Sequence, residues 1–407
     1  MREGKGTTRV YDVIGSLARS LVGLGGGGRP SYVLLRLTDV LGLGEEGSSG
    51  PVDMYEQASR PLIPRSPPPR GALRGVVHIG VDSSSRLVST PAADVVISAL
   101  SVSGPGPVEL CDRPALYPNI SCLGDGAPPF TYVVPHGAVE LPEADGVTVV
   151  SSDPSQLSNA FISAVMDYSR LSLETWALLG PARWAASAYA SALRLPVLLL
   201  DGPAFIGAGR GVPAPMEARL RAIEGLEGVG VPVIGVVKRV ERSRILSSSP
   251  RFVALAERCG ARATDVADTM LLQQLASSGC SGVVPGRAYA TPKVMVREGG
   301  LSKVVEYVLI VPGPLQRPGV RSRVYRLEYT ERTLGLLEGI GVDPLQAFLA
   351  DTLLRQSLEP VTIAASDRRA KMITSALKGL LAKAILGLGG RLGYETELEE
   401  GGASALA

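Results

Sequence analysis

The segment 196–202, with the sequence PVLLLDG, constrains the fold more than any other part of the chain. Its apolar residues follow one another without alternation and end on an acid, which is typical of a strand buried on both faces of a sheet. A similar run, VPVIGVVK at 231–238, follows a helical pattern at 214–228. Buried strands that are separated by a helix favour an α/β fold around a central sheet.

Further strand and helix patterns lie on both sides of these two runs. The predicted strands are 74–82, which ends on an acid and is followed by a Ser83-Ser84-Ser85 turn, then 93–104, the start of 147–158, 303–312 and 321–330. The predicted helices are 155–179, a stretch from the Gly180-Pro181 break to Leu195, 344–356 and 366–386.

The chain divides into three predicted parts. Residues 1–73 form a helical extension, with helices at 8–24 and 31–43 and a Pro-rich linker at 59–70. Residues 74–390 form the main domain, with an insertion at 105–146. Residues 391–407 form a disordered tail. The run GLGGGG at 23–28 lacks the Lys-Ser/Thr of a phosphate loop and is interpreted as a flexible connector.

Composition bounds the class of protein. With 45% hydrophobic and 20% charged residues the chain can bury a core, and a net charge of +2 excludes a strongly basic DNA-coating protein. No apolar run is long enough for a membrane helix and no signal peptide is present, so a cytoplasmic protein without membrane contact is expected. Few asparagines and 31 prolines indicate a thermophile, although GC-biased coding would also enrich arginine.

The four cysteines, Cys111, Cys122, Cys259 and Cys280, do not indicate a metal site. None forms a CxxC pair and neither histidine lies near them, so zinc is not expected. Buried free thiols are the expected state, with a Cys111–Cys122 disulfide as the alternative in a hyperthermophile.

Three acids occupy positions that favour chemistry. Asp82 ends the first strand of the main domain, Glu174 lies on a helix, and Asp201 ends the most buried strand. Carboxylates at the carboxyl ends of strands face the crevice where open α/β sheets bind ligands. Their hard oxygens suit Mg²⁺ or Mn²⁺. Local turns are the alternative, since Asp82 precedes serines and Asp201 precedes glycine.

Several short segments occur in an order that resembles one family. They are GVDSSS (80–85), RLSLE (170–174), VLLLDGP (197–203), VPVIGVVKR (231–239), YRLEY (325–329) and GVDPLQAFLAD (341–351). Together they resemble the NurA family, the archaeal nucleases that act with the HerA helicase-translocase. The resemblance spans about residues 74–375.

The resemblance implies a ribonuclease H-like core with a mixed central sheet and a Mn²⁺- or Mg²⁺-dependent nuclease that processes DNA ends in recombinational repair. It also implies a homodimer docked on a HerA-type hexameric ATPase. By position, Asp82, Glu174 and Asp201 match the metal-binding carboxylates of the family. Arg170 matches a basic residue one turn before the glutamate, where it orients Glu174, touches a phosphate or forms an ordinary surface ion pair.

This sequence departs from the family near its C-terminus. The family shows a Tyr-Pro start and a histidine eight residues after the tyrosine, and in the segment 341–351 those positions are Asp343 and Asp351. Asp351 is therefore predicted as an additional metal ligand, with a solvated helix face as the alternative. For Asp343, which precedes Pro344, the favoured interpretation is the N-terminus of a helix. The 27 positions from Glu174 to Asp201 are also more than the family usually has.

Clusters of basic residues accompany the later strands and the last helix. The predicted DNA contacts are Arg170, Lys238, Arg239, Arg323 and Arg326. Such clusters are often solvated surface, but around the acids they fit a groove that follows a phosphate backbone.

Two other functions remain open at this level. A non-catalytic subunit that dimerises and couples the ATPase to DNA is suggested by Asp343 and Asp351. A nucleotide-binding enzyme is suggested only by GAGRG at 207–211, which does not follow its strand directly as the dinucleotide fingerprint requires.

Overall fold

The structure is a computed structural model. It describes residues 10–23, 31–34, 51–67, 73, 75–105, 109–117, 120–122, 124–136, 146–151, 159–204, 214–238, 240–241, 243–264, 266–278, 280, 282–298, 301–313, 322–352 and 357–393.

Within these residues the strands form one mixed 14-stranded sheet. The strands are β1 (Ser31–Leu34), β2 (Val52–Met54), β3 (Ile63–Arg65), β4 (Val76–Ser89), β5 (Ala93–Ser103), β6 (Glu109–Arg113), β7 (Thr131–Pro135), β8 (Val147–Ser151), β9 (Leu195–Asp201), β10 (Val233–Val237), β11 (Ala288–Ala290), β12 (Val294–Glu298), β13 (Leu301–Ile310) and β14 (Arg323–Tyr329). Their order is β1-β8-β7-β5-β4-β9-β10-β14-β13-β11-β3, with β6 beside β5 and β2-β12 beside β13.

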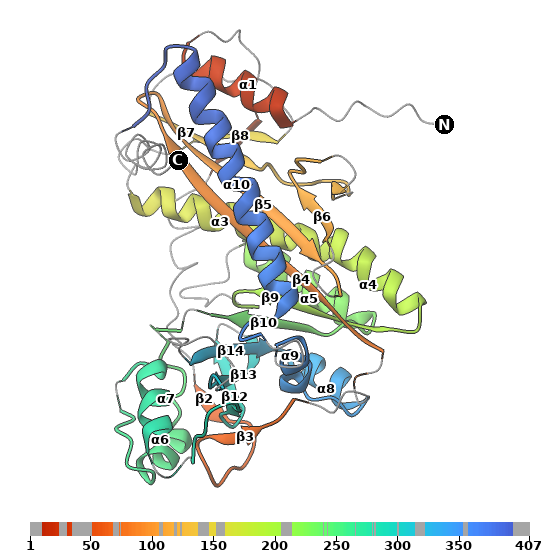
Figure 1. Cartoon of the computed structure of the whole chain (residues 1–407), viewed down its shortest axis with the longest axis vertical. Coiled ribbons are helices and arrows are strands. Elements are labelled where there is room, and N and C mark those ends of the chain that lie inside the picture. The colour runs from red at the N-terminus through yellow and green to blue at the C-terminus, as the bar shows by residue number, and fades with distance from the viewer. Residues whose placement is uncertain are drawn as a thin grey trace.

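Helices cover both faces of this sheet. They are α1 (Val10–Leu21), α3 (Asn159–Leu179), α4 (Pro181–Ser191), α5 (Ala214–Gly228), α6 (Pro250–Glu257), α7 (Asp268–Ser277), α8 (Glu331–Glu338), α9 (Pro344–Thr352) and α10 (Val361–Gly387). Figure 1 shows the long α10 running over β4 and β5, with α1 crossing its far end. No helix among the described residues has the length and apolar character that a membrane crossing requires.

The core lies in layers on the two faces of the sheet, because side chains alternate along each strand. On one face, Val88 of β4 shares an apolar cluster with Ile373 and Leu377 of α10. On the other face, Ile79 and Val81 of β4 share a cluster with residues of α3, α4 and α5. We call the first of these the α10 face of β4 and the second the α3 face.

The two apolar runs form neighbouring parallel strands at the centre, as predicted. β9 pairs in parallel with β4 on one side and with β10 on the other. The predicted helix break is also confirmed, since α3 ends at Leu179 and α4 begins at Pro181. The predicted turn at Ser83-Ser84-Ser85 is wrong: β4 continues to Ser89, because residues 80–89 pair without interruption with residues 94–103 of β5.

The N-terminal 73 residues contribute strands to the sheet, which the sequence prediction missed. A helix was predicted over 31–43, but Ser31–Leu34 form β1, parallel to β8, and residues 35–43 lie outside the described part. Within the predicted Pro-rich linker, β3 pairs with β11. Short segments gain backbone hydrogen bonds at a sheet edge that a free linker would lack. Of the predicted connector at 23–28, residues 24–28 are outside the described part.

The segment 105–146, predicted as an insertion, is partly built into the sheet. β6 pairs with β5, and β7 lies between β5 and β8. At the other end of the chain, Leu392 is buried in the cluster with α1 and α10, and Gly393 donates its N–H to Ser89 O. The rest of the predicted tail, 394–407, is outside the described part.

The cysteines form two disulfides, Cys111–Cys122 and Cys259–Cys280, so the expectation of free thiols is wrong. The pairs lie in different parts of the fold, the first on β6 and the second between the ends of α6 and α7. The alternative of a Cys111–Cys122 disulfide is confirmed, and the Cys259–Cys280 pair was not predicted.

Glu306 on β13 carries a buried carboxyl group. Glu306 is fully buried, and neither of its carboxyl oxygens has a hydrogen-bond partner among the described residues. Burial, together with the charge of Asp343, raises the pKa of Glu306 from 4.5 to about 8, although Lys293 lowers it. The folded protein therefore keeps a proton on Glu306 that the unfolded chain releases.

We expect Glu306→Gln to change the pH dependence of stability. Between pH 4.5 and about 8 the wild type loses stability as pH rises, because the folded state binds more protons than the unfolded state. The glutamine variant lacks this loss, so its advantage grows with pH, to on the order of 1–3 kcal/mol near pH 8. Thermal unfolding of both proteins at pH 5 and pH 8.5 measures it. The exposed Glu257→Gln is the control, and equal shifts at both pH values would contradict the expectation.

Candidate metal centre

Two of the predicted acids meet on the α10 face of the central strands. Val81 of β4 pairs with Leu200 of β9, so the next residues along the two parallel strands, Asp82 and Asp201, are neighbours on the same face. Asp367 approaches them from α10. Oxygen atoms of Asp82, Asp201 and Asp367 all lie within 4.8 Å of one another. We call these three residues the aspartate cluster.

Asp82 is the most enclosed member of the cluster. Its side chain is 4% exposed, and its Oδ1 accepts the backbone N–H of Ser83 at 2.7 Å. Its Oδ2 is buried without a hydrogen-bond partner among the described residues. Burial and the charges of Asp201 and Glu174 raise the pKa of Asp82 well above its ordinary value. The positive charge of Lys238 lowers this pKa by less, and a buried acceptor oxygen without a hydrogen-bond donor is costly.

Asp201 lies beside a cation supplied by the next strand. The Nζ of Lys238, which follows β10, lies 2.7 Å from Asp201 Oδ2 and 2.5 Å from Glu359 Oε1. Burial raises the pKa of Asp201 to about 6, although Lys238 lowers it. Burial lowers the pKa of Lys238, but Asp201 and Glu359 raise it by more, so that its ammonium stays charged.

Asp367 is the member that sequence reasoning missed. It lies in the first turns of α10, which approach β4 closely because residue 80 is glycine: a Cβ there would lie 2.5 Å from the backbone of Thr362. Burial raises the pKa of Asp367, but Lys371 and Lys238 lower it by more. A signal did exist: Glu359-Pro360 precedes α10 and Asp367 follows Glu359 by eight residues, the spacing described above for the family's tyrosine and histidine.

Glu174 lies next to the aspartate cluster but on the opposite face of the sheet. Its Oε1 accepts the hydroxyl of Ser83 at 2.6 Å, and its Oε2 accepts from Arg219 at 2.7 Å. Because neighbouring strand residues point to opposite faces, Ser83 faces α3 while Asp82 faces α10. The structure thus does not bring Glu174 into the cluster, although its charge raises the pKa of Asp82.

Asp351 and Asp343 serve helix N-termini. The Oδ2 of fully buried Asp351 accepts the N–H and the hydroxyl of Thr362, which satisfies a free donor in the first turn of α10. Asp343 Oδ1 accepts the N–H of Leu345 at the start of α9, as the N-terminus interpretation predicted, and its Oδ2 binds Lys293. The described structure does not place either residue in the aspartate cluster.

The predicted DNA-binding residues fall into different environments. Arg170 and Arg323 are exposed, and Arg170 pairs with Asp167 on α3. Arg326 is 3% exposed and its guanidinium binds Glu328 and Ser243 inside the fold, which argues against the predicted DNA contact. Arg239 lies outside the described residues.

The residues of the aspartate cluster fit a hard divalent cation. They offer only carboxylate oxygens, one of them buried without a partner, and carboxylates are the preferred ligands of Mg²⁺ and Mn²⁺. Burial, and after it repulsion between the carboxylates, raises the pKa values of Asp82 and Asp201, a cost that a bound cation would relieve.

The fold and this centre define a class: a mixed α/β protein with an acidic cluster on its central strands. The sequence model of the NurA domain family matches residues 147–372, more than half of the chain, and the chain belongs to this family. The crystal structure of the NurA nuclease from Sulfolobus solfataricus is similar with a TM-score of 0.40 and 9% sequence identity, over 83% of this chain and 88% of that chain. No curated protein matches the sequence.

Proposed function

We propose that this chain is a divalent-metal-dependent DNA nuclease that cleaves phosphodiester bonds at DNA ends. The observation that carries the proposal is the aspartate cluster, which joins a central strand, its parallel neighbour and the last helix. Membership of the NurA family supports the nuclease activity. We assign the metal to Asp82, Asp201 and Asp367, and not to Asp351, because Asp351 already binds the N-terminus of α10.

The order of the central strands supports a ribonuclease H-like core. β7, β5 and β4 are antiparallel neighbours, and β4, β9 and β10 are parallel neighbours. This part of the sheet thus combines an antiparallel half and a parallel half, and Asp82 and Asp201 lie where the two halves meet.

The chain's own residues have distinct parts in the reaction. Asp82, Asp201 and Asp367 would hold Mn²⁺ or Mg²⁺, which would neutralise charge on the phosphate and assist the attack of water. Lys238 places a positive charge beside Asp201, where negative charge develops on the phosphate. Glu174, held by Ser83 and Arg219, adds negative charge from the α3 face and remains a proposed catalytic residue.

DNA contacts are proposed for the exposed cations around the centre. Arg323 and Arg170 are accessible, and Arg239 remains a predicted contact. Such contacts act on the phosphate backbone without reading the sequence. A homodimer, a HerA-type ATPase partner, a role in recombinational repair and a cytoplasmic, thermophilic setting are proposed on the family resemblance.

The alternative is a subunit that has lost catalysis and couples the ATPase to DNA. The sequence suggested it through Asp343 and Asp351. Glu359 and Asp367 have the same eight-residue spacing, and Asp367 is the one that lies in the aspartate cluster. An aspartate cannot replace a histidine as a proton donor near pH 7 at its ordinary pKa, and the pKa of Asp367 is lowered.

The test is cleavage of end-labelled linear DNA with Mn²⁺ at high temperature. We expect the wild type to cut and Asp201→Asn to cut at least about 10²-fold more slowly. The control is Asp53→Asn, which removes an exposed carboxylate paired with Arg297 and should cut as the wild type does. If the wild type cuts no DNA even with the ATPase present, the nuclease proposal is wrong and the coupling subunit is favoured.

A further inference from the structure

We propose that Asp112 is a positioning residue of the metal centre: through Arg369 it holds α10 in the rotation that directs Asp367 at Asp82 and Asp201. The Cys111–Cys122 disulfide, which flanks Asp112, contributes by restraining the strand that carries Asp112. The inference rests on the proposed metal-binding function, and its test separates the two.

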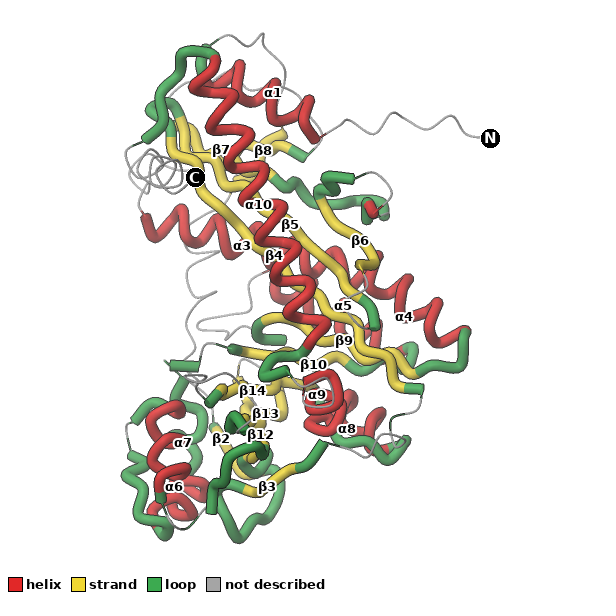
Figure 2. The backbone as a smooth tube through the Cα atoms, in the orientation of Figure 1, coloured by secondary structure: helices red, strands yellow, loops and turns green. Residues whose placement is uncertain are grey.

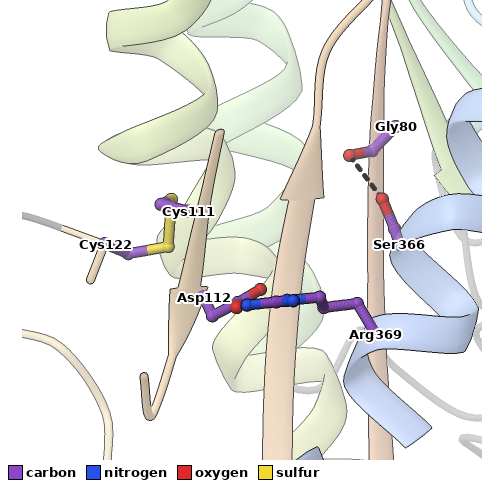
Figure 3. The surroundings of a disulfide bond; sticks show 6 residues. All are labelled: Gly80, Cys111, Asp112, Cys122, Ser366 and Arg369. Carbon is purple, nitrogen blue, oxygen red and sulfur yellow. Dashed lines mark hydrogen bonds and ion pairs between the residues drawn. A yellow bond between two sulfur atoms is a disulfide. The ribbon is translucent and has the colours of Figure 1, made fainter. Parts of the chain in front are cut away.

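The contact between β6 and α10 is a buried ion pair. The Nε of Arg369 lies 2.6 Å from Asp112 Oδ2; Asp112 is fully buried and the side chain of Arg369 is 14% exposed. Figure 3 shows the two side chains meeting between the strand and the helix. Charge-assisted hydrogen bonds in such surroundings are short and directional, so they fix the position of the helix that carries the guanidinium.

Asp367 lies between two anchors of α10. Ser366, immediately before it, donates its hydroxyl to Gly80 O at 3.0 Å and lies 2.9 Å from Ser103 Oγ. Arg369, two residues after it, binds Asp112. The anchors contact β4, β5 and β6, and residues one or two positions apart leave a helix in different directions. Rotation of α10 would break one anchor or the other, and it is this rotation that sets the direction of Asp367.

The disulfide holds the strand that carries Asp112. Among the described strands β6 pairs only with β5, so it is an edge strand. Cys111 precedes Asp112, and its disulfide partner Cys122 donates its N–H to Asp112 O at 2.9 Å. Figure 3 shows the disulfide on the side of β6 away from α10. On the side of β6 away from β5, the backbone of Asp112 forms only an isolated bridge to Ser121 among the described residues, and the covalent link between Cys111 and Cys122 holds that segment against it.

The test is direct Mn²⁺ binding, measured from the electron paramagnetic resonance signal of free Mn²⁺ at a temperature where every variant is folded. We expect Asp112→Asn, which keeps the shape of the side chain and removes its charge, to weaken Mn²⁺ binding about 10- to 100-fold. Because Asp112 acts through Arg369, Asp112→Asn combined with Arg369→Gln should lose no more than the stronger single variant.

The disulfides provide a matched pair of variants. Replacing Cys111 and Cys122 by serine should weaken Mn²⁺ binding in the same direction as Asp112→Asn. Replacing Cys259 and Cys280 by serine, in the α6–α7 part of the fold, should leave it unchanged. Thermal unfolding of all variants is recorded alongside, since a merely structural role would lower the unfolding temperature without changing the Mn²⁺ affinity of the folded protein.

The outcomes distinguish the inference from the proposed function. If the wild type binds no Mn²⁺, or Asp82→Asn binds it as the wild type does, the proposed metal centre is wrong. If the wild type binds Mn²⁺ through Asp82 but Asp112→Asn keeps full affinity, the centre stands and the positioning role of Asp112 is overturned.

Discussion

Asp367→Asn should abolish Mn²⁺ binding at the aspartate cluster and slow DNA cleavage roughly 10²- to 10³-fold. The substitution removes one of three carboxylates whose oxygens lie within 4.8 Å of one another, and it keeps the size of the side chain. Because Asp367 is only half-buried, we expect the variant to fold as the wild type does. Mn²⁺ titration and cleavage of end-labelled DNA, with the variant and the wild type at equal concentration, measure it.

Asp351→Asn is the matched comparison, because the sequence predicted Asp351 as an additional metal ligand. Asp351 is fully buried and accepts two hydrogen bonds from Thr362. We expect the asparagine to cost about 1–3 kcal/mol of stability and to leave Mn²⁺ affinity near that of the wild type. Loss of Mn²⁺ binding in Asp351→Asn together with full binding in Asp367→Asn would reverse the assignment.

Gly80→Ala should damage both stability and the metal centre. An added Cβ would lie 2.5–2.9 Å from backbone atoms of Thr362 and Ile363, and backbone cannot rotate away as a side chain does. We expect a loss of about 1–3 kcal/mol from overpacking. Because relief of the clash moves the start of α10 off β4, Asp367 retreats from Asp82 and Mn²⁺ binding weakens. Denaturant unfolding and Mn²⁺ titration test the two effects.

Gly225→Ala is the control for this substitution. Gly225 lies inside α5, and a Cβ added there meets no atom within 4 Å. Alanine is the better helix former, so this variant should gain up to about 1 kcal/mol and bind Mn²⁺ normally. A Gly80→Ala protein as stable as the wild type, with unchanged Mn²⁺ affinity, would contradict the close approach of α10 to β4.

The sequence predicted the strands and helices whose pattern is strong and local. The unbroken apolar runs became β9 and β10, and Gly180-Pro181 separated α3 from α4. It failed where the pattern is short or ambiguous: the apolar spacing at 31–43 fits a helix, but Ser31–Leu34 pair with β8. So short a segment adopts the structure in which spatially adjacent segments supply hydrogen bonds. Here that segment is β8, which is more than 100 residues away in the sequence.

The cations illustrate the same limit. Arg323 and Arg326 belong to one cluster in sequence, yet the first is exposed and the second is buried against Glu328. Residue type indicated two positive charges beside a strand. Which of them faces solvent depends on the elements packed on each face of the sheet, and one contact of Arg326, with Ser243, comes from 83 positions away.

By itself, the sequence determined the class of fold and indicated two of the three residues of the aspartate cluster. Asp82 lies in one strand that local hydrophobicity defines, and Asp201 ends another. Only the tertiary structure decided the third. Asp367 is an ordinary helical acid among basic neighbours until Gly80 lets α10 approach β4. Thr362 binds Oδ2 of Asp351 at the start of α10, and Ser83 and Arg219 hold Glu174 on the other face of the sheet, so neither residue joins the aspartate cluster. A carboxylate's role depends on which partners surround it, and those partners are assembled by packing across the sheet.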